Sequence, residues 1–225
     1  MNTQHVFHNQ ERPRERLLQH GPKVLTTPEL LAVVLGTGAK GRDAVKFSAD
    51  LLEQFSGLRN LLAAEHKSLR SVKGMGDAKI CQLQAINELA SRSMEEELRR
   101  SDTLSNSQLV KRYCINRLGH LGVEHCIAIY LDARYQLICC KEVSRGTLTK
   151  TSVYPREVAI DALKLNAAAV ILSHNHPSGV AEASDSDIRL TKHLQKALAL
   201  IDVSLLDHIV VSSKEACSMS EQGLF

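Results

Sequence analysis

Two histidines and an aspartate in the second half of the chain have the types and the spacing of metal ligands. His174 and His176 stand two residues apart at the end of an apolar run, and Asp187 follows near the start of a helical pattern. Side chains two residues apart on a strand point to the same face of a sheet. Two histidines, one carboxylate and an open position for water suit tetrahedral Zn²⁺. We therefore expect His174, His176 and Asp187 to bind zinc.

Each part of this pattern also has an ordinary structural explanation. Pairs of surface histidines are common, and Ser184 and Asp187 have the spacing of a capping box, with Ser at the N-cap and the acidic residue at position N3. The hypothesis of a metal site depends on the combination, because the end of the strand and the start of the helix are expected to meet at one corner of the fold.

The elements that must position these residues alternate between strands and helices. Strands are expected at 126–132, 135–140, 167–173 and 206–211, and helices at 107–118, from 155 onward and at 185–201. In the last helix, apolar residues recur at the spacing of one helical face. Strands that alternate with helices are typical of a layered α/β domain.

The first half of the chain has helical patterns throughout. Helices are expected at 27–35, 44–55, 58–64 and 78–94, and the first of them is expected to have Thr27 as N-cap and Pro28 as first helical residue. Residues 95–106 hold charges and turn formers and few apolar side chains, which favours a linker. We therefore expect a helical domain at 1–100 and an α/β domain at 103–225.

Composition excludes several classes of protein. Of the 225 residues, 44% are hydrophobic and 24% charged, which excludes a wholly disordered chain, collagen and a membrane bundle. The polar N-terminus shows no signal peptide, so we expect a cytoplasmic protein with reduced cysteines and no membrane partner. Residues 1–100 carry 15 Lys and Arg against 12 Asp and Glu, and the second half is balanced. This small basic excess is weak support for a nucleic-acid partner.

Two glycine motifs occur in the first half. Residues 36–41 match GxGxxG, but a dinucleotide site needs a preceding strand, and a helix is expected there. The run from Val72 to Lys79 resembles helix-hairpin-helix modules, in which backbone N–H groups hold a DNA phosphate. Gly74 and Gly76 are expected to adopt positive φ and to allow close approach, and Lys73 and Lys79 could add phosphate contacts. A plain glycine-terminated turn is the alternative.

The spacing HxHP, then six residues, then SxxD, resembles the JAMM (MPN+) metalloprotease signature. The whole chain resembles the bacterial RadC family through a few further segments. These are RPRERLLQHGP at 12–22, Gly-Met-Gly at 74–76, SRGTL at 144–148, YPREV at 154–158, HNHPSG at 174–179 and LDHI at 206–209. The resemblance implies an MPN/JAB-type α/β (α+β) domain preceded by a small all-α helix-hairpin-helix domain. Ala183 is a departure, since Pro commonly precedes the motif Ser.

The resemblance also implies residue roles. Zinc would be bound by His174, His176 and Asp187, with water as the fourth ligand. Glu124, which opens a strand, would act as general base, and Ser184 would donate a hydrogen bond to the developing oxyanion.

Other residues compete for these roles. Glu142 and Glu157 are rival carboxylates, but the first lies within a strand and the second in the first turn of a helix, where an acidic residue is favoured. His193 and His208 are expected to be structural.

Three functions follow from this reading. The first is a zinc-dependent peptidase or isopeptidase-type hydrolase with an unknown protein or peptide substrate, associated with DNA through its N-terminal domain. The second is a DNA-binding repair or recombination factor whose metal site is not catalytic. The third is a metal-dependent nuclease, although two-metal carboxylate sites are commoner in that chemistry.

Overall fold

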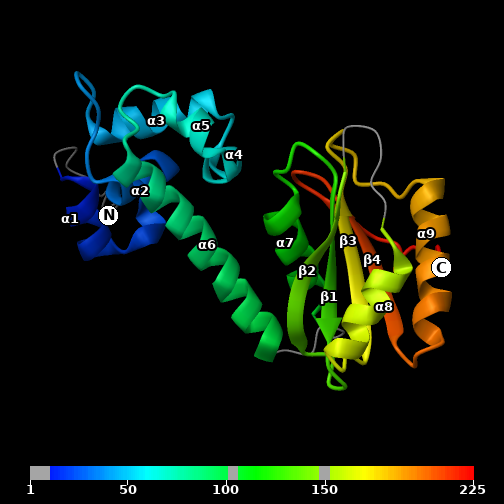
Figure 1. Cartoon of the computed structure of the whole chain (residues 1–225). Coiled ribbons are helices and arrows are strands. Elements are labelled where there is room, and N and C mark those ends of the chain that lie inside the picture. The colour runs from blue at the N-terminus through cyan, green and yellow to red at the C-terminus, as the bar shows by residue number, and fades with distance from the viewer. Residues whose placement is uncertain (1–10, 101–105, 147–152) are drawn as a thin grey trace, which may run out of the picture. The chain divides into compact units, whose positions relative to one another are not determined.

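The computed structural model describes residues 11–100, 106–146 and 153–225 (Figure 1). The chain divides into two compact units, Met1–Glu88 and Leu89–Phe225. The expected domain boundary between residues 100 and 103 lies beside residues 101–105, outside the described ranges, and stays a prediction. Among the described helices, none is both long and apolar enough to cross a membrane.

Short helices form the first unit. They are α1 (Pro13–His20), the 3₁₀ helix η1 (Pro22–Val24), α2 (Thr27–Leu35), α3 (Ala44–Gln54), α4 (Leu58–Ala63), α5 (His66–Arg70) and the first part of α6 (Asp77–Arg100). Their apolar faces share one core, in which Phe47, Leu61, Leu69 and Ile80 are fully buried.

The start of α2 differs by one residue from the sequence prediction. Thr26, and not Thr27, is the N-cap: its backbone N–H and its hydroxyl both donate to Glu29 Oε2 at 2.8 Å. The capping box requires the acidic residue at position N3, so Glu29 selects Thr26. Pro28 therefore stands second in the helix, where its missing N–H is still without cost.

The glycine-rich loop at residues 36–41 follows helix α2 and precedes α3. Ala39 and Arg42 exchange two backbone hydrogen bonds of 3.1 and 2.9 Å, which close a tight turn. A Cβ at Gly38 would lie 2.1 Å from the Arg42 carbonyl oxygen. Because a helix and not a strand precedes this loop, the GxGxxG match is a turn motif and not a dinucleotide fingerprint.

The turn between α5 and α6 contains the Gly74–Gly76 segment. Gly74 has φ of +104°, and a Cβ there would lie 2.5 Å from the Ala39 Cβ, so this position requires glycine. Gly76 is not among the glycines with positive φ, and a Cβ there would meet nothing within 4 Å. The expectation of positive φ is therefore correct for Gly74 and wrong for Gly76.

Helix α6 is longer than the sequence prediction. The expected end near Met94 is wrong, because the helix continues to Arg100. Leu98 is fully buried in a core of the second unit, and Arg99 donates to the Ile138 carbonyl oxygen at 2.7 Å. The charge of residues 95–100 favours a linker. However, Glu, Leu and Arg are strong helix formers, and the last turns are anchored by Leu98 and by hydrogen bonds from Tyr113 and Arg117 to Glu95.

A mixed sheet of five strands forms the centre of the second unit. The strands are β1 (His125–Leu131), β2 (Leu137–Arg145), β3 (Ala169–Asn175), β4 (Ser204–Val211) and β5 (Ala216–Ser218), in the spatial order β2-β1-β3-β4-β5. The pair β3–β4 is parallel, and the other three pairs are antiparallel. A parallel pair needs a crossover connection, which helix α9 (Asp185–Ala199) supplies.

Helices cover both faces of this sheet (Figure 1). Helix α7 (Ser107–Leu118) packs with Ile127 on one face, and α8 (Pro155–Lys164) and α9 pack with Ala128 on the other. Alternation along β3 places His174 on the face that carries Leu172, which is the face of α8 and α9. The helices and the mixed sheet confirm the expected α/β (α+β) architecture of the second unit.

Candidate metal centre

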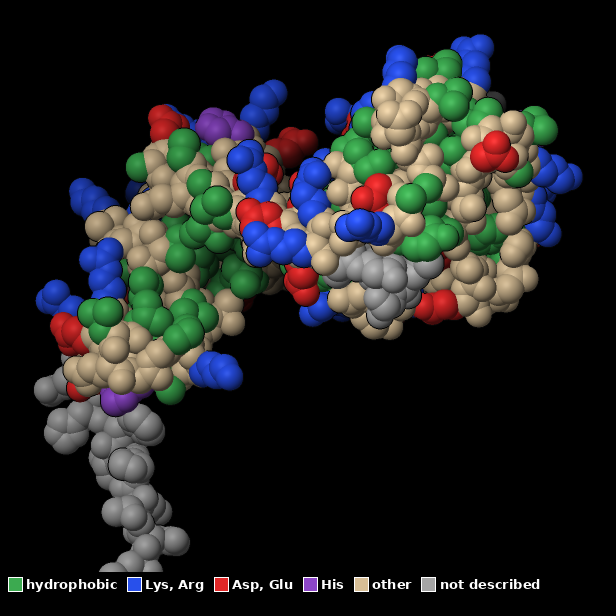
Figure 2. Space-filling view, turned by 90° about the horizontal axis from the view of Figure 1, so that it is seen from below, with side chains coloured by type: hydrophobic (Ala, Val, Ile, Leu, Met, Phe, Trp, Pro, Cys, Tyr) green, Lys and Arg blue, Asp and Glu red, His purple; other side chains and the backbone are tan. Residues whose placement is uncertain are grey.

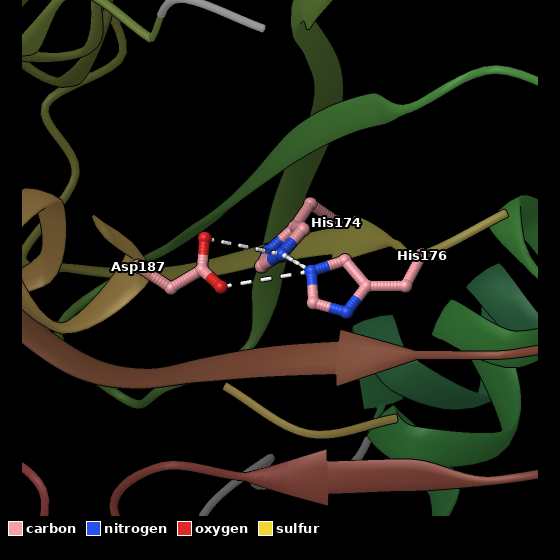
Figure 3. Close-up of side chains that lie close together, drawn as sticks. All are labelled: His174, His176 and Asp187. Atoms are coloured by element: carbon pink, nitrogen blue, oxygen red, sulfur yellow. Dashed lines mark hydrogen bonds and ion pairs between the residues drawn. The ribbon is translucent and has the colours of Figure 1, made fainter. Parts of the chain in front are cut away.

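The three predicted ligands meet at one point of the second unit (Figure 3). His174 Nε2 lies 2.9 Å from His176 Nε2 and 3.4 Å from Asp187 Oδ1, and His176 Nε2 lies 3.6 Å from Asp187 Oδ2. Two ligands of a tetrahedral zinc ion, each about 2.0–2.1 Å from the metal, lie roughly 3.4 Å apart. The observed separations are close to that value.

The end of β3 and the turn after it position the two histidines. His174 is buried within the strand between Cys126 of β1 and Val210 of β4. His176 follows the last strand residue, and its backbone N–H donates to the Val211 carbonyl oxygen at 2.9 Å. Extended backbone therefore persists through both residues, so their side chains share a face, as the spacing predicted.

The first turn of α9 positions Asp187. Ser184 is the N-cap, and both its backbone N–H and its hydroxyl donate to Asp187 Oδ2, at 2.7 and 2.6 Å. The Asp187 N–H donates back to Ser184 Oγ at 3.3 Å. The predicted capping box is therefore present, and it aims the carboxylate at the histidines instead of excluding a ligand role.

A hydrogen bond on the far side of His176 decides which ring nitrogen carries the proton. His176 Nδ1 lies 3.2 Å from the Val180 carbonyl oxygen, which can only accept. Nδ1 therefore carries the proton, and the Nε2 lone pair of the neutral ring points at His174 and Asp187. Electron-rich atoms that converge at such distances call for a cation between them, so the residues fit a zinc ion by their donor chemistry.

Charge and burial strongly perturb these groups. Burial acts to raise the pKa of Asp187, but its contacts with His174, His176 and Ser184 outweigh burial and hold that pKa well below its usual range. The neighbouring Asp187 carboxylate raises the pKa of His176, because it stabilises the protonated ring. Burial lowers the pKa of His208, which lies behind His174, well below its usual value. The site is therefore built around an ionised carboxylate.

Glu124 lies at the same end of the sheet. It is half-buried and stands directly before β1, whose Cys126 pairs with His174. Its charge contributes to the raised pKa of His176, although as the smallest of the causes. Among the residues proposed as general base, Glu124 is the carboxylate with this link to the site.

The two rival carboxylates are engaged elsewhere. Glu142 lies within β2 and contacts His125 Nδ1 at 2.8 Å. Glu157 lies in the first turn of α8 and pairs with Arg156 at 3.1 Å. Both positions are those expected from the sequence.

Asn175 joins the segment of Glu124 to the segment of the histidines. Its Oδ1 accepts from the His125 backbone N–H at 2.8 Å, and its Nδ2 donates to the carbonyl oxygens of Leu121 and Val123, both at 3.0 Å. Asn175 is buried, so these bonds satisfy a costly polar group. The residue between the two histidines therefore fixes the backbone on both sides of Glu124.

Ser184 is committed to Asp187 in this structure. The 2.6 Å contact from its Oγ to a carboxylate oxygen uses its single hydroxyl proton. The Ser186 hydroxyl, 2.7 Å away, then acts as a donor to Ser184 Oγ. The proposed hydrogen bond from Ser184 to an oxyanion therefore requires that this proton turn away from Asp187.

The predicted phosphate-binding residues lie in the first unit and differ in their availability. Lys79 Nζ donates to the carbonyl oxygens of Gly38 and Gly74, at 2.6 and 3.1 Å, and lies 4.7 Å from the ring centroid of Phe47. Lys79 therefore holds the two turns together. The Lys73 side chain is exposed at the turn.

Charge on the visible face of the molecule is mixed. Figure 2 shows Lys and Arg side chains spread over that face among acidic and hydrophobic ones. Within each unit, the described residues on the side drawn show no continuous basic stripe, the usual electrostatic footprint of a nucleic-acid site.

Sequence reasoning missed three residues beside the centre. They are Asn175, Thr191 and His208. His208 was expected to be structural, yet its Nε2 lies 2.8 Å from His174 Nδ1. A histidine within an apolar strand was the available signal, but only the pairing of β4 with β3 places it behind a ligand.

Family models match both parts of the chain. A RadC-like JAB domain matches residues 104–224, and a UPF0758 N-terminal model matches residues 5–81. The chain is 54% identical over 211 residues to a UPF0758 protein of Bordetella pertussis, with 94% of each chain covered. It is 50% identical over 216 residues to one of Nitrosospira multiformis, covering 95% and 96%. The chain therefore belongs to the UPF0758 family of RadC-like proteins and carries a RadC-like JAB domain.

Proposed function

We propose that the chain is a zinc-dependent hydrolase that cleaves peptide or isopeptide bonds. One observation carries this proposal: His174, His176 and Asp187 present ligand atoms that all lie within 4.8 Å of one another. Three protein ligands that leave one position open are the pattern of catalytic zinc, whereas structural zinc sites use four protein ligands. The JAB domain match agrees with such a site.

Each residue has a role in this mechanism. When bound, zinc supplies a Lewis acid that polarises a carbonyl group and makes a water molecule more acidic. Glu124 accepts the proton of the attacking water and passes it to the leaving amine. Ser184 donates a hydrogen bond from its hydroxyl group to the developing oxyanion. Asn175 holds Glu124 in place through the backbone on either side of it.

The variant Glu124→Gln tests this function. It keeps the shape of the side chain and removes the base, so zinc content stays that of the wild type. Turnover falls by about 10²–10⁴-fold, the usual contribution of general acid–base catalysis. Metal analysis measures the first quantity, and a panel of peptide, isopeptide and DNA substrates measures the second.

Glu142→Gln is the matched control, because Glu142 is the rival carboxylate and pairs with His125 on β2. We expect its turnover to equal that of the wild type. Loss of turnover in Glu142→Gln with none in Glu124→Gln would move the base to β2. If the zinc-loaded wild type cleaved only DNA, the nuclease hypothesis would replace the peptidase hypothesis.

Two further proposals concern the surroundings of the protein. We propose a cytoplasmic location, supported by six cysteines that are free thiols in the structure. We also propose that the first unit associates with DNA, with the exposed Lys73 as a phosphate contact. Either association or hydrolysis can fail without the other, since they involve different units of the chain.

A further inference from the structure

A line of buried side chains connects two of the proposed ligands behind the centre. His208 of β4 is 0% exposed and is not a ligand itself. Its Nε2 lies 2.8 Å from His174 Nδ1, and its Nδ1 lies 2.6 Å from Thr191 Oγ1. Thr191 Oγ1 in turn lies 2.6 Å from the Asp187 carbonyl oxygen. The line therefore begins at one ligand and ends at the backbone of another.

The protons along this line can be placed by counting donors. The Asp187 carbonyl oxygen only accepts, so the 2.6 Å contact requires the Thr191 hydroxyl proton. Thr191 Oγ1 can then only accept from His208, which places the proton of the neutral His208 ring on Nδ1. His208 Nε2 is left as an acceptor, so the 2.8 Å contact requires a proton on His174 Nδ1.

The reverse arrangement leaves an unfavourable contact. If the Thr191 hydroxyl donated to His208 Nδ1, no proton would lie between Thr191 Oγ1 and the Asp187 carbonyl oxygen, only 2.6 Å apart. The other neighbour of the hydroxyl is Met219 Sδ at 3.7 Å, a weak acceptor that does not compete. Only one direction satisfies both short contacts of Thr191.

We propose that His208 and Thr191 are positioning residues that fix the tautomer of His174. They hold the His174 proton on Nδ1, so that the Nε2 lone pair faces His176 and Asp187 before any cation binds. The inference rests on the proposed metal centre for its purpose, while the proton positions follow from the hydrogen bonds alone. Outer groups that orient a metal-binding histidine typically change metal affinity by about 10–100-fold when removed.

Nuclear magnetic resonance tests the proton positions directly. The full-length protein is prepared with ¹⁵N-labelled histidine, and long-range ¹H–¹⁵N correlation spectra are recorded without metal and with zinc. Loss of the signals in His208→Gln assigns them to His208. We expect a protonated Nδ1 and an unprotonated Nε2 for His208 in both states. Protonation of His208 Nε2 would overturn the proposal, whatever the protein binds or cleaves.

Two variants of Thr191 test the effect on the metal. Thr191→Val has nearly the same shape and removes the hydroxyl, so zinc affinity falls about 10-fold or more; Thr191→Ser keeps the hydroxyl and keeps the affinity. Ser173→Ala is the matched control, because the buried Ser173 hydroxyl bonds to the Ile209 carbonyl oxygen, outside the line. Zinc affinity is measured by competition with a chelator, and folding by circular dichroism.

The outcomes separate this inference from the proposed function. Equal zinc affinity in Thr191→Val and Thr191→Ser would overturn the positioning role, even in an active hydrolase. A wild type that binds no zinc would contradict the metal proposal. The ¹H–¹⁵N spectra would still test the proton positions of His208 in that case. Zinc binding with the expected spectra but without hydrolysis would support the positioning role and contradict the hydrolase.

Discussion

The Asp187 carboxylate belongs both to the cap of helix α9 and to the candidate metal site. Its Oδ2 accepts two hydrogen bonds from Ser184, and Oδ1 faces His174. Asp187→Asn keeps an oxygen for the cap and loses the charge, whereas Asp187→Ala loses both. We expect zinc affinity to fall in both variants by more than the 10–100-fold typical of outer groups. Only Asp187→Ala also loses about 1 kcal/mol of stability, as for a lost cap.

The two effects are measured on the metal-free and metal-loaded protein. Thermal unfolding without metal reports the cap, where 1 kcal/mol shifts Tm by about 2–4 °C in a chain of this size. Zinc content measures the loss of Asp187 as a metal ligand. A His174→Ala/His176→Ala double variant is the reference for a lost site. Zinc content equal to the wild type in this double variant or in Asp187→Ala would place the metal elsewhere.

A second prediction concerns the buried side chain of Asn175. Asn175→Ala leaves the His125 N–H and two carbonyl oxygens without their partner, at about 1–3 kcal/mol for each buried group that stays unsatisfied. We expect the free energy of unfolding of the second unit to fall by about 2 kcal/mol or more. Hydrogen exchange at the His125 amide is expected to speed up. Protection equal to the wild type would show that other contacts hold this segment.

The sequence allowed the three converging side chains to be predicted, but not their supports. HxH on a strand and a capping box on a helix are local patterns, so local rules place His174, His176 and Asp187. His208 contacts His174 because β3 and β4 pair in the register that sets Leu172 beside His208. Register is a property of two strands together, and one strand's pattern does not contain it.

At the scale of elements, the Gly74–Gly76 turn provides a matched pair. Gly74→Ala forces a Cβ to within 2.5 Å of Ala39 and a side chain into φ of +104°. We expect it to destabilise the first unit by about 2 kcal/mol or more, from left-handed strain and overpacking together. Gly76→Ala meets no atom within 4 Å and stays close to the wild type. Chemical denaturation followed by circular dichroism measures both.

Equal stabilities of these two variants would mean that the turn adapts, and that close packing of Ala39 is not needed. The same pair informs the phosphate hypothesis. A backbone phosphate site needs open space beside the glycine. Gly76 has that space, whereas the space beside Gly74 is filled by Ala39.

Regular elements were predictable where periodicity is long and were missed where it is short. The amphipathic pattern of α9 predicts a helix that starts at Asp185, and the apolar run at 126–132 predicts strand β1. Strand β5 has three residues and helix α5 five, too few for a period to show. The last turns of α6 were not predictable from charge, because the same charged residues that are typical of a linker also have a high helix propensity.

At the scale of the whole molecule, charge bears on the association with DNA. Lys73→Ala removes an exposed cation, so the full-length chain is expected to bind DNA with a salt slope smaller by up to about one unit. Lys79→Ala instead frees two carbonyl oxygens and is expected to destabilise the first unit. Fluorescence anisotropy at several salt concentrations measures the slope, and thermal unfolding measures the stability.

No DNA binding by the wild type at low salt would leave the turn as a packing motif. An unchanged slope in Lys73→Ala, with binding intact, would place the phosphate contacts elsewhere. Because phosphate contacts position a protein without reading bases, little sequence preference is expected.

The proposed metal ligands and their supports lie on one continuous stretch of chain. His174, His176, Asp187, Thr191 and His208 all fall within β3, α9, β4 and their connections, a single strand–helix–strand unit. Glu124 lies outside that unit and is joined to it through Asn175. If the proposed roles hold, a substitution at the base would leave the strand–helix–strand unit of the ligands intact. A homologue could then bind the metal without being an enzyme.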